Sequence, residues 1–309
     1  MRRVIFVFLD GIGLGLENKD NPFFTTPTPF LEQLLDGKKL TRTVGDRIYP
    51  GAVLLALDAV LGVDGLPQSA TGQCSLFTGV NAPKLLGYHL NAYPNEALKE
   101  ALKEKNMFLQ LMEKGLKCTF ANAYRPDSLD AVLKGSNNHL PCTTLMNFFA
   151  GLPFRTLADM DNGQAVFMDI TNSYLIKQGY KAKLVTPEEA GKRLAGIAKD
   201  FHLTLYESFI TDIVGHSANF DDASMVVMLL DKFLASVAAN LDKDKDILLV
   251  TSDHGNLEDL GVKGHTKCQV PALIVGSGRE ELARLINRKK DITGVLPALL
   301  DYLSASTQN

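Results

Sequence analysis

The feature that most constrains this chain is a short apolar run, Ile247 to Thr251, followed closely by an acidic residue and a histidine. The run is too short for a typical helix and β-rich enough to be a buried strand of a parallel sheet. In an open α/β sheet, ligands bind beyond the carboxyl ends of the strands. Asp253 and His254 are therefore predicted to project into the crevice where proteins of this architecture carry out chemistry.

His265 is predicted to return to the same crevice, because Gly255 allows a sharp exit from the strand and Gly264 lets the backbone turn back. An adjacent acidic residue and imidazole also have a plain structural interpretation, in which they cap a loop or bond to backbone amides. The pair by itself does not decide between these two interpretations, so other segments have to be considered.

A second apolar run, Val4 to Leu9, leads to Asp10 and the glycine-rich segment Gly11 to Gly15. This segment does not fit the dinucleotide-binding fingerprint, which needs GxGxxG at the start of a helix and an acidic residue about 20 positions later. Here the acidic residue precedes the glycines, and a polar stretch follows them. The pattern favours Asp10 as a metal ligand at the end of a strand.

Composition and charge indicate an ordinary globular enzyme. The 309 residues suffice for one large α/β domain with an insertion. Hydrophobic residues make up 46% and charged residues 22%, which excludes a disordered chain and a coiled coil. A net charge of −3 gives no general attraction to nucleic acid or to an anionic membrane. The sequence leaves the oligomeric state open.

The N-terminal segment, MRRVIFVFLD, imitates a secretory signal only briefly. Its apolar run is too short and no small-residue cleavage site follows it. No later stretch is long and apolar enough to span a bilayer. The four cysteines form no CxxC pair, which favours reduced thiols and a cytoplasmic location.

A turn-rich segment at 65–73 leads into a helix that we expect from about Thr71 to Thr78. A hydroxyl at a helix N-terminus lies where the backbone N–H groups and the helix dipole attract an anion, so a phosphate group could bind there. Ser69 and Thr71 are the candidate hydroxyls. The alternative is that they only cap the helix, which serine and threonine do for structural reasons.

Asp212 and His216 are four residues apart and follow a strand expected at 202–209. On a helix this spacing would place both side chains on one face. A bend around Gly215 after a strand would also bring them together, so the local conformation stays open.

The remaining periodicity predicts helices and strands around these positions. Helices are expected at 28–37, 96–114, 187–201, 222–240 and 291–303, and strands at 52–60 and 117–121. Periodicity weakens after residue 121, which indicates a small insertion or lid within about 85–170. Arg125, Arg155 and Lys267 are candidates for binding anionic groups of a substrate, with a solvated surface position as the alternative for each.

Four separate segments thus place acidic residues or histidines at or just beyond a strand end. The set comprises Asp10, Asp212, His216, Asp253, His254 and His265. Three carboxylates and three imidazoles exceed what one tetrahedral zinc ion needs, and they divide naturally between two cations. Two ions roughly 4 Å apart stabilise both the entering and the leaving oxygen of a phosphoryl transfer, and one of them would activate a serine hydroxyl.

The order and spacing of five motifs resemble the alkaline phosphatase superfamily, in the branch of cofactor-independent phosphoglycerate mutase and phosphopentomutase, over nearly the whole chain. The motifs are DGIGLG at 10–15, QSATGQ at 68–73, TDIVGH at 211–216, TSDHGN at 251–256 and GHTKCQVPALIVG at 264–276. The resemblance implies one metal held by Asp10, Ser69, Asp253 and His254, and another held by Asp212, His216 and His265. It also implies that Ser69 is the nucleophile, with Thr71 as the runner-up.

Two departures from the mutases bear on the reaction. The mutases usually carry His after the motif glycine and Asn or Asp before the nucleophile, where this chain has Gln73 and Gln68. They also carry a large, arginine-rich inserted domain that handles the phosphorylated substrate, and the room between Ser69 and Asp212 is much smaller here. A mutase must keep water away from its phosphorylated intermediate. The small lid therefore favours hydrolysis over isomerisation.

We therefore predict a single α/β domain over 1–309, with a mostly parallel sheet flanked by helices on both faces and a small inserted lid. The predicted activity is hydrolysis of a small phosphate ester through a phosphoserine intermediate, with two divalent cations, Mn²⁺ or Zn²⁺, as cofactors. The alternatives are a phosphomutase, a phosphodiesterase and a non-catalytic metal-binding protein. A sulfatase is disfavoured because the chain has no CxPxR-type segment.

Overall fold

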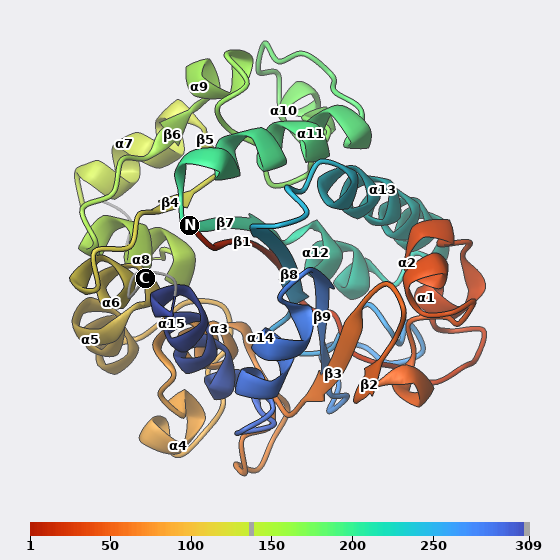
Figure 1. Ribbon diagram of the computed structural model, residues 1–309. Helices are drawn as coiled ribbons and strands as arrows, with labels where there is room; N and C mark the ends of the chain where they lie inside the picture. Colours follow the sequence, from red (N-terminus) through yellow and green to blue (C-terminus); the bar gives the residue numbers. More distant parts are fainter. Residues whose placement is uncertain (136–138, 306–309) are drawn as a thin grey trace.

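The computed structural model describes residues 1–135 and 139–305, and a seven-stranded sheet forms its centre (Figure 1). The strand order is β2-β3-β9-β8-β1-β7-β4, and neighbours within the block β8-β1-β7-β4 are parallel. Strand β9 is antiparallel to both β8 and β3, and β2 is antiparallel to β3. The strands are β1 (Arg3–Leu9), β2 (Arg47–Ile48), β3 (Val53–Leu57), β4 (Cys118–Phe120), β7 (Leu203–Ser208), β8 (Asp246–Thr251) and β9 (Val270–Gly276). The predicted α/β fold is confirmed; the sheet is mixed, with a parallel core of β8, β1, β7 and β4 and antiparallel pairing at β9, β3 and β2.

Helices cover both faces of the sheet, which explains why β1 and β8 consist almost entirely of apolar residues. Alternate side chains of β1 enter two separate cores, with Phe6 and Phe8 on one face and Ile5 and Val7 on the other. The first face packs against α3 (Ser69–Thr78), α5 (Glu96–Lys105), α6 (Met107–Glu113), α8 (Cys142–Phe149), α14 (Arg279–Ile286) and α15 (Val295–Ser304). The second packs against α1 (Pro22–Thr25), α2 (Pro29–Leu34), α11 (Pro187–Ile197), α12 (Ile210–Ser217) and α13 (Phe220–Ala239).

A small lobe lies beyond β4 and has a core of its own, built around Met160, Phe167 and Leu175. It contains a two-stranded parallel sheet of β5 (Ala123–Tyr124) and β6 (Arg155–Thr156), with α7 (Pro126–Leu133), α9 (Leu157–Asp161) and α10 (Ser173–Lys177) nearby (Figure 1). Helix α4 (Ala82–Leu86) lies earlier, after α3. The stretch 85–170 also supplies β4 to the main sheet, and its description as an inserted lid stays a prediction.

The helix expected at 96–114 is two helices, α5 and α6, separated at Asn106. The backbone of Asn106 is extended, with φ −72° and ψ 160°, and its side chain accepts a hydrogen bond from the N–H of Leu109 at 3.1 Å. This is an N-cap, and it starts a new helix where the apolar periodicity alone indicated continuation. Among the described residues, no helix combines the length and the apolar character needed to cross a membrane.

Helix α3 packs closely against the segment that follows β8, because Gly72 has no side chain. A Cβ at this position would lie 2.7 Å from the carbonyl oxygen of Asp253 and 3.0 Å from its Cβ. The close approach places the first turn of α3, including Ser69, beside Asp253 and His254.

We expect Gly72→Ala to lower the free energy of unfolding by about 1–3 kcal/mol, since the added methyl group must push α3 away from Asp253. Urea denaturation measures the effect. The matched control is Gly196→Ala on α11, where a Cβ would meet nothing within 4 Å. That change is expected to be neutral or to stabilise by up to about 1 kcal/mol. Equal effects of the two substitutions would contradict the close packing of α3 on Asp253.

Candidate metal centre

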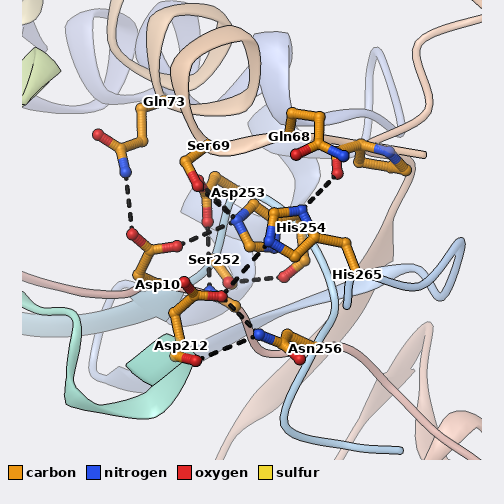
Figure 2. Close-up of polar contacts among 12 residues, drawn as sticks. Asp10, Gln68, Ser69, Gln73, Asp212, Ser252, Asp253, His254, Asn256 and His265 are labelled. Atoms are coloured by element: carbon orange, nitrogen blue, oxygen red, sulfur yellow. Dashed lines mark hydrogen bonds and ion pairs between the residues drawn. The ribbon is translucent and has the colours of Figure 1, made fainter. Parts of the chain in front are cut away.

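Three aspartates lie where three neighbouring strands end. Asp10 follows β1, Asp253 comes just after β8, and Asp212 lies in the first turn of α12, shortly after β7. Strand β1 pairs in parallel with both β7 and β8, so the three carboxyl ends share one edge of the sheet. Figure 2 shows the three side chains around a common centre, although more than 200 residues separate the first from the others in sequence.

His254 forms the middle of the first group of candidate ligands. Its Nε2 lies 3.1 Å from Oδ1 of Asp10, 3.6 Å from Oδ2 of Asp253 and 3.0 Å from Oγ of Ser69 (Figure 2). All four residues are buried. The structure therefore brings together the four residues that the resemblance assigned to one metal.

The second group is built on α12. This helix resolves the open question about residues 210–217, because Asp212 and His216 are one turn apart on one face, with Oδ2 and Nε2 at 3.3 Å. Nε2 of His265 lies 3.6 Å from Oδ1 of Asp212 and 3.2 Å from Nε2 of His216. The ring of His265 stacks on that of His254 with centroids 3.8 Å apart, so the two groups adjoin. The side chain of His216 is 47% exposed, and the second group therefore opens to solvent.

The residues present fit divalent cations. Oδ1 of Asp10 and Oδ2 of Asp253 are buried and accept no hydrogen bond, and the imidazole of His254 is their shared neighbour at 3.1 and 3.6 Å. Such atoms cost free energy unless a proton or cation compensates them. Candidate ligand atoms of Asp212, His216 and His265 lie within 4.8 Å of one another, as do those of Asp10, Asp212 and His254. Carboxylate and imidazole donors suit Mn²⁺ or Zn²⁺. Asp212 is within reach of both groups.

The charges of the cluster perturb its pKa values strongly. Burial and the neighbouring Asp10 raise the pKa of both Asp253 and Asp212. Burial lowers the pKa of His254, but the carboxylates of Asp253 and Asp10 outweigh it and raise the value to about 10. Burial and the nearby His254 lower the pKa of His265 to about 4, so this imidazole is neutral at pH 7. Its Nδ1 donates to the carbonyl oxygen of Pro67 at 2.9 Å, which leaves Nε2 as the ligand atom.

We expect the stabilisation of the protein by Mn²⁺ to increase from pH 5.5 to pH 8. Because the pKa values of Asp212, Asp253 and His254 are raised, the metal-free folded protein binds protons at these side chains. Proton binding stabilises the folded state at low pH, and this stabilisation is lost as the pH rises through those pKa values. Cations must displace these protons, which weakens binding about tenfold per pH unit for each proton on acidification. Tm with and without Mn²⁺ at the two pH values tests this. A gain in Tm that is equal or larger at pH 5.5 would contradict it.

Glu258 is a buried residue of the centre that was not predicted from the sequence. Its Oε2 accepts hydrogen bonds from the N–H groups of Gly13 and Asn256, both at 2.8 Å, and its Oε1 accepts one from the hydroxyl of Thr266. These three partners belong to the loops that carry Asp10, the Asp253–His254 pair and His265. One carboxylate thus holds the three ligand loops in register. In sequence it looks like any acidic residue in a polar loop.

Replacing Glu258 by Ala is expected to weaken Mn²⁺ binding about 10- to 100-fold, because residues that orient metal ligands have effects of this size. Calorimetric titration measures the affinity, and Glu258→Gln provides a second variant that retains the size of the side chain. The control is Glu280→Ala on the exposed surface of α14. Unchanged affinity in both Glu258 variants would show that the loops keep their positions without it.

Two amides orient ligand carboxylates. Nε2 of Gln73 donates to Oδ2 of Asp10 at 3.1 Å, and Nδ2 of Asn256 donates to Oδ1 of Asp212 at 2.6 Å (Figure 2). Gln73 occupies the place where the mutases usually carry His, so the departure preserves a polar contact to a candidate metal ligand. The amides leave Oδ1 of Asp10 and Oδ2 of Asp212 for other ligands.

The two candidate nucleophiles differ in what they contact. Ser69 is the first residue of α3, and the N-cap position belongs to Gln68, so the hydroxyl of Ser69 does not cap the helix. It points instead to His254 (Figure 2). The hydroxyl of Thr71 donates to the backbone carbonyl of Gln68 at 3.2 Å. The geometry favours Ser69 over Thr71.

The structure gives the three candidate substrate-binding cations different surroundings. Arg125 lines a cavity and donates to Gln178 and Ser128. Arg155 donates to the carbonyl oxygens of Phe120 and Gln164, and Lys267 is exposed. Within residues 1–135 and 139–305, no hydrogen bond or ion pair joins any of the three to the metal centre. Their role in substrate binding stays a prediction.

Comparisons with known proteins agree with this geometry. The family model described as "Metalloenzyme superfamily" matches residues 154–306, which include five of the candidate ligands. The 2,3-bisphosphoglycerate-independent phosphoglycerate mutase of Mycoplasmopsis synoviae is 29% identical over 123 residues, which is 38% of this chain and 24% of that enzyme. The corresponding mutase of Legionella pneumophila strain Corby is 31% identical over 104 residues, or 31% of this chain and 20% of that enzyme. The matches thus span a quarter or less of these curated relatives.

Solved structures show the same fold along nearly the whole chain. The alkaline phosphatase from the Antarctic bacterium TAB5 aligns with a TM-score of 0.55 and 13% identity, covering 98% of each chain. A Pyrococcus horikoshii protein aligns with a TM-score of 0.59 and 14% identity, covering 98% of this chain and 96% of that one. The predicted resemblance is confirmed: residues 154–306 match the metalloenzyme superfamily model, and the fold is the one seen in an alkaline phosphatase. That superfamily comprises metal-dependent phosphoryl transferases, among them phosphatases and phosphomutases.

Proposed function

We propose that this protein is a metal-dependent phosphohydrolase that cleaves a small phosphate ester through a phosphoserine at Ser69. One observation carries the proposal: the hydroxyl of Ser69 lies at the N-terminus of the ten-residue helix α3, 3.0 Å from Nε2 of His254 and inside a cluster of metal-ligand side chains. A helix N-terminus favours a phosphate group. Nucleophile, candidate ligands and an anion-binding helix end therefore meet at one place.

Two divalent cations would be held by the two groups of side chains. The first group is Asp10, Ser69, Asp253 and His254, and the second is Asp212, His216 and His265. When bound, such ions supply a lowered pKa for a coordinated hydroxyl and offset the charge of the transferring phosphoryl group. Manganese and zinc are the candidates.

The bond changes follow from the position of Ser69. Its Oγ loses a proton and forms a bond to phosphorus, while the bond from phosphorus to the ester oxygen breaks in line. The departing oxygen keeps the electron pair and takes a proton from solvent. Water then attacks the phosphoserine and releases inorganic phosphate, and Oγ regains a proton. The first turn of α3 faces the phosphoryl oxygens in both steps.

A phosphomutase is the second candidate, and the comparisons support it equally, because the curated relatives are mutases. The case for hydrolysis rests on the shorter stretch between Ser69 and Asp212, which leaves less protein to keep water from a phosphorylated intermediate. A mutase would return an isomer of the substrate without net release of inorganic phosphate. A phosphodiesterase and a non-catalytic metal-binding protein are further outcomes that the same assay recognises.

We expect Ser69→Ala to reduce phosphate release about 1,000-fold or more, the scale typical of a lost nucleophile. The assay screens phosphomonoesters, phosphodiesters and sugar phosphates with Mn²⁺ or Zn²⁺, and it records both inorganic phosphate and isomerised product. Thr71→Val is the matched control and is expected to retain turnover. Acid quenching should trap phosphate on the peptide that contains Ser69. Full turnover by Ser69→Ala would exclude the proposed mechanism.

A further inference from the structure

A cavity of about 290 Å³ lies between the end of β7, the start of α8 and the small lobe. Its wall is unusually rich in aromatic rings, contributed by Tyr93, Phe120, Tyr124, Phe167, Tyr174 and Phe209. Binding sites for small organic groups are typically lined in this way, with few polar groups to fix the orientation. The polar group that matters most here is the carboxyl group of Glu207.

Glu207 is 5% exposed and lines the cavity. Oε2 accepts a hydrogen bond from the hydroxyl of Thr143 at 2.7 Å, while Oε1 has no hydrogen bond among the described residues. The side chain of Asn122 holds the backbone of Glu207 from both sides, accepting from its N–H at 2.9 Å and donating to its carbonyl at 2.7 Å. Burial raises the pKa of Glu207 to about 8. The carboxyl group of Glu207 is thus held in place at the wall of the cavity by Thr143 and by the backbone contacts of Asn122.

The cavity lies near the proposed nucleophile, although neither Ser69 nor a candidate metal ligand lines it. Leu203 and Leu205 point to the face of the sheet that packs on α3, and the alternation of a strand directs Glu207 to that face as well. In register, Glu207 lies beside Phe8, two residues before Asp10. On the other side, Sγ of Cys142 at the start of α8 donates to the carbonyl oxygen of Ala70, next to Ser69, at 3.6 Å. A phosphate ester at Ser69 could therefore extend its organic part into this cavity.

We propose that the cavity binds the organic part of the substrate and that this part carries an ammonium group. The inference rests on the proposed function and names its substrate class. A buried carboxylate is costly without a cation, and aromatic faces attract cations through their quadrupoles. An ammonium group satisfies both, with an N–H donated to Oε1 of Glu207.

The basic side chains that line the cavity are those of Arg125 and His139. Arg125 has a side chain that is 29% exposed; its guanidinium donates to Gln178 and Ser128 and lies 3.8 Å from Asp127, so a carboxylate already offsets its charge. The ring of His139 lies 5.3 Å from that of Tyr93. An ammonium group in the cavity favours the ionised form of Glu207, whereas an anionic organic group disfavours that form. The substrate class therefore differs from phosphoglycerate, whose organic part carries a carboxylate.

The test compares three phosphate esters of similar size, namely O-phosphoethanolamine, neutral 2-hydroxyethyl phosphate and anionic phosphoglycolate. We expect kcat/KM to be at least about tenfold higher for O-phosphoethanolamine than for the neutral ester, which corresponds to one good charged contact. Glu207→Gln keeps the size of the side chain and an acceptor for Thr143. It should abolish this preference, while Glu280→Gln should leave the ratio of the two kcat/KM values unchanged.

A binding measurement separates this inference from the proposed function. Calorimetric titration of Ser69→Ala with Mn²⁺ present should show tighter binding of O-phosphoethanolamine than of the neutral ester, and Glu207→Gln in the same background should remove the difference. Selective binding without any hydrolysis by the wild-type protein would contradict the proposed phosphohydrolase activity and would still support the ammonium-binding cavity. Hydrolysis with equal or better use of the neutral or anionic ester, or an ammonium preference that survives in Glu207→Gln, would overturn the cavity assignment.

Discussion

The proximity of Asp10, Asp212 and Asp253 is the interaction on which the rest of this structure depends. Two of these carboxylates are buried and the third is largely buried; Asp10 raises the pKa of both Asp212 and Asp253, and Asp212 further raises that of Asp253. Such a cluster is stable only when protons or cations compensate it. The carboxylates are nevertheless held together because parallel strands bring three chain segments to one edge of the sheet. Glu258 then connects the loops through three hydrogen bonds.

Helix α3 joins this charged centre to the more apolar part of the molecule. Gly72 lets the helix approach Asp253, which brings the hydroxyl of Ser69 to His254. The same helix start touches Cys142, which begins α8 at the wall of the aromatic cavity. The proposed phosphoryl transfer and the proposed recognition of an organic group therefore meet at one short stretch of backbone. The packing of α3 against both Asp253 and Cys142 connects these two proposed roles.

Much of the fold and of the candidate site was predictable because the signals are local. A short apolar run followed by Asp or His marks a buried strand and its carboxyl end, and this pattern located Asp10, Asp253 and His254. Glu258 and Glu207 could not be found in this way, since their partners lie on other segments of the chain. Asn106 was missed for a different reason: a cap interrupts a helix without interrupting the apolar periodicity.

The sequence by itself determined the strand ends, the buried faces and the identity of the candidate ligands, because hydrophobic patterning and side-chain chemistry belong to each short segment. The motif resemblance assigned the ligands to two groups, but only the tertiary structure decided the distances within each group, that residues 210–217 are helical, and that Ser69 rather than Thr71 faces His254. Only the packed chain reveals the cavity at Glu207. The physical reason is that distances between segments follow from strand pairing and helix packing, which the order of residues along one segment does not contain.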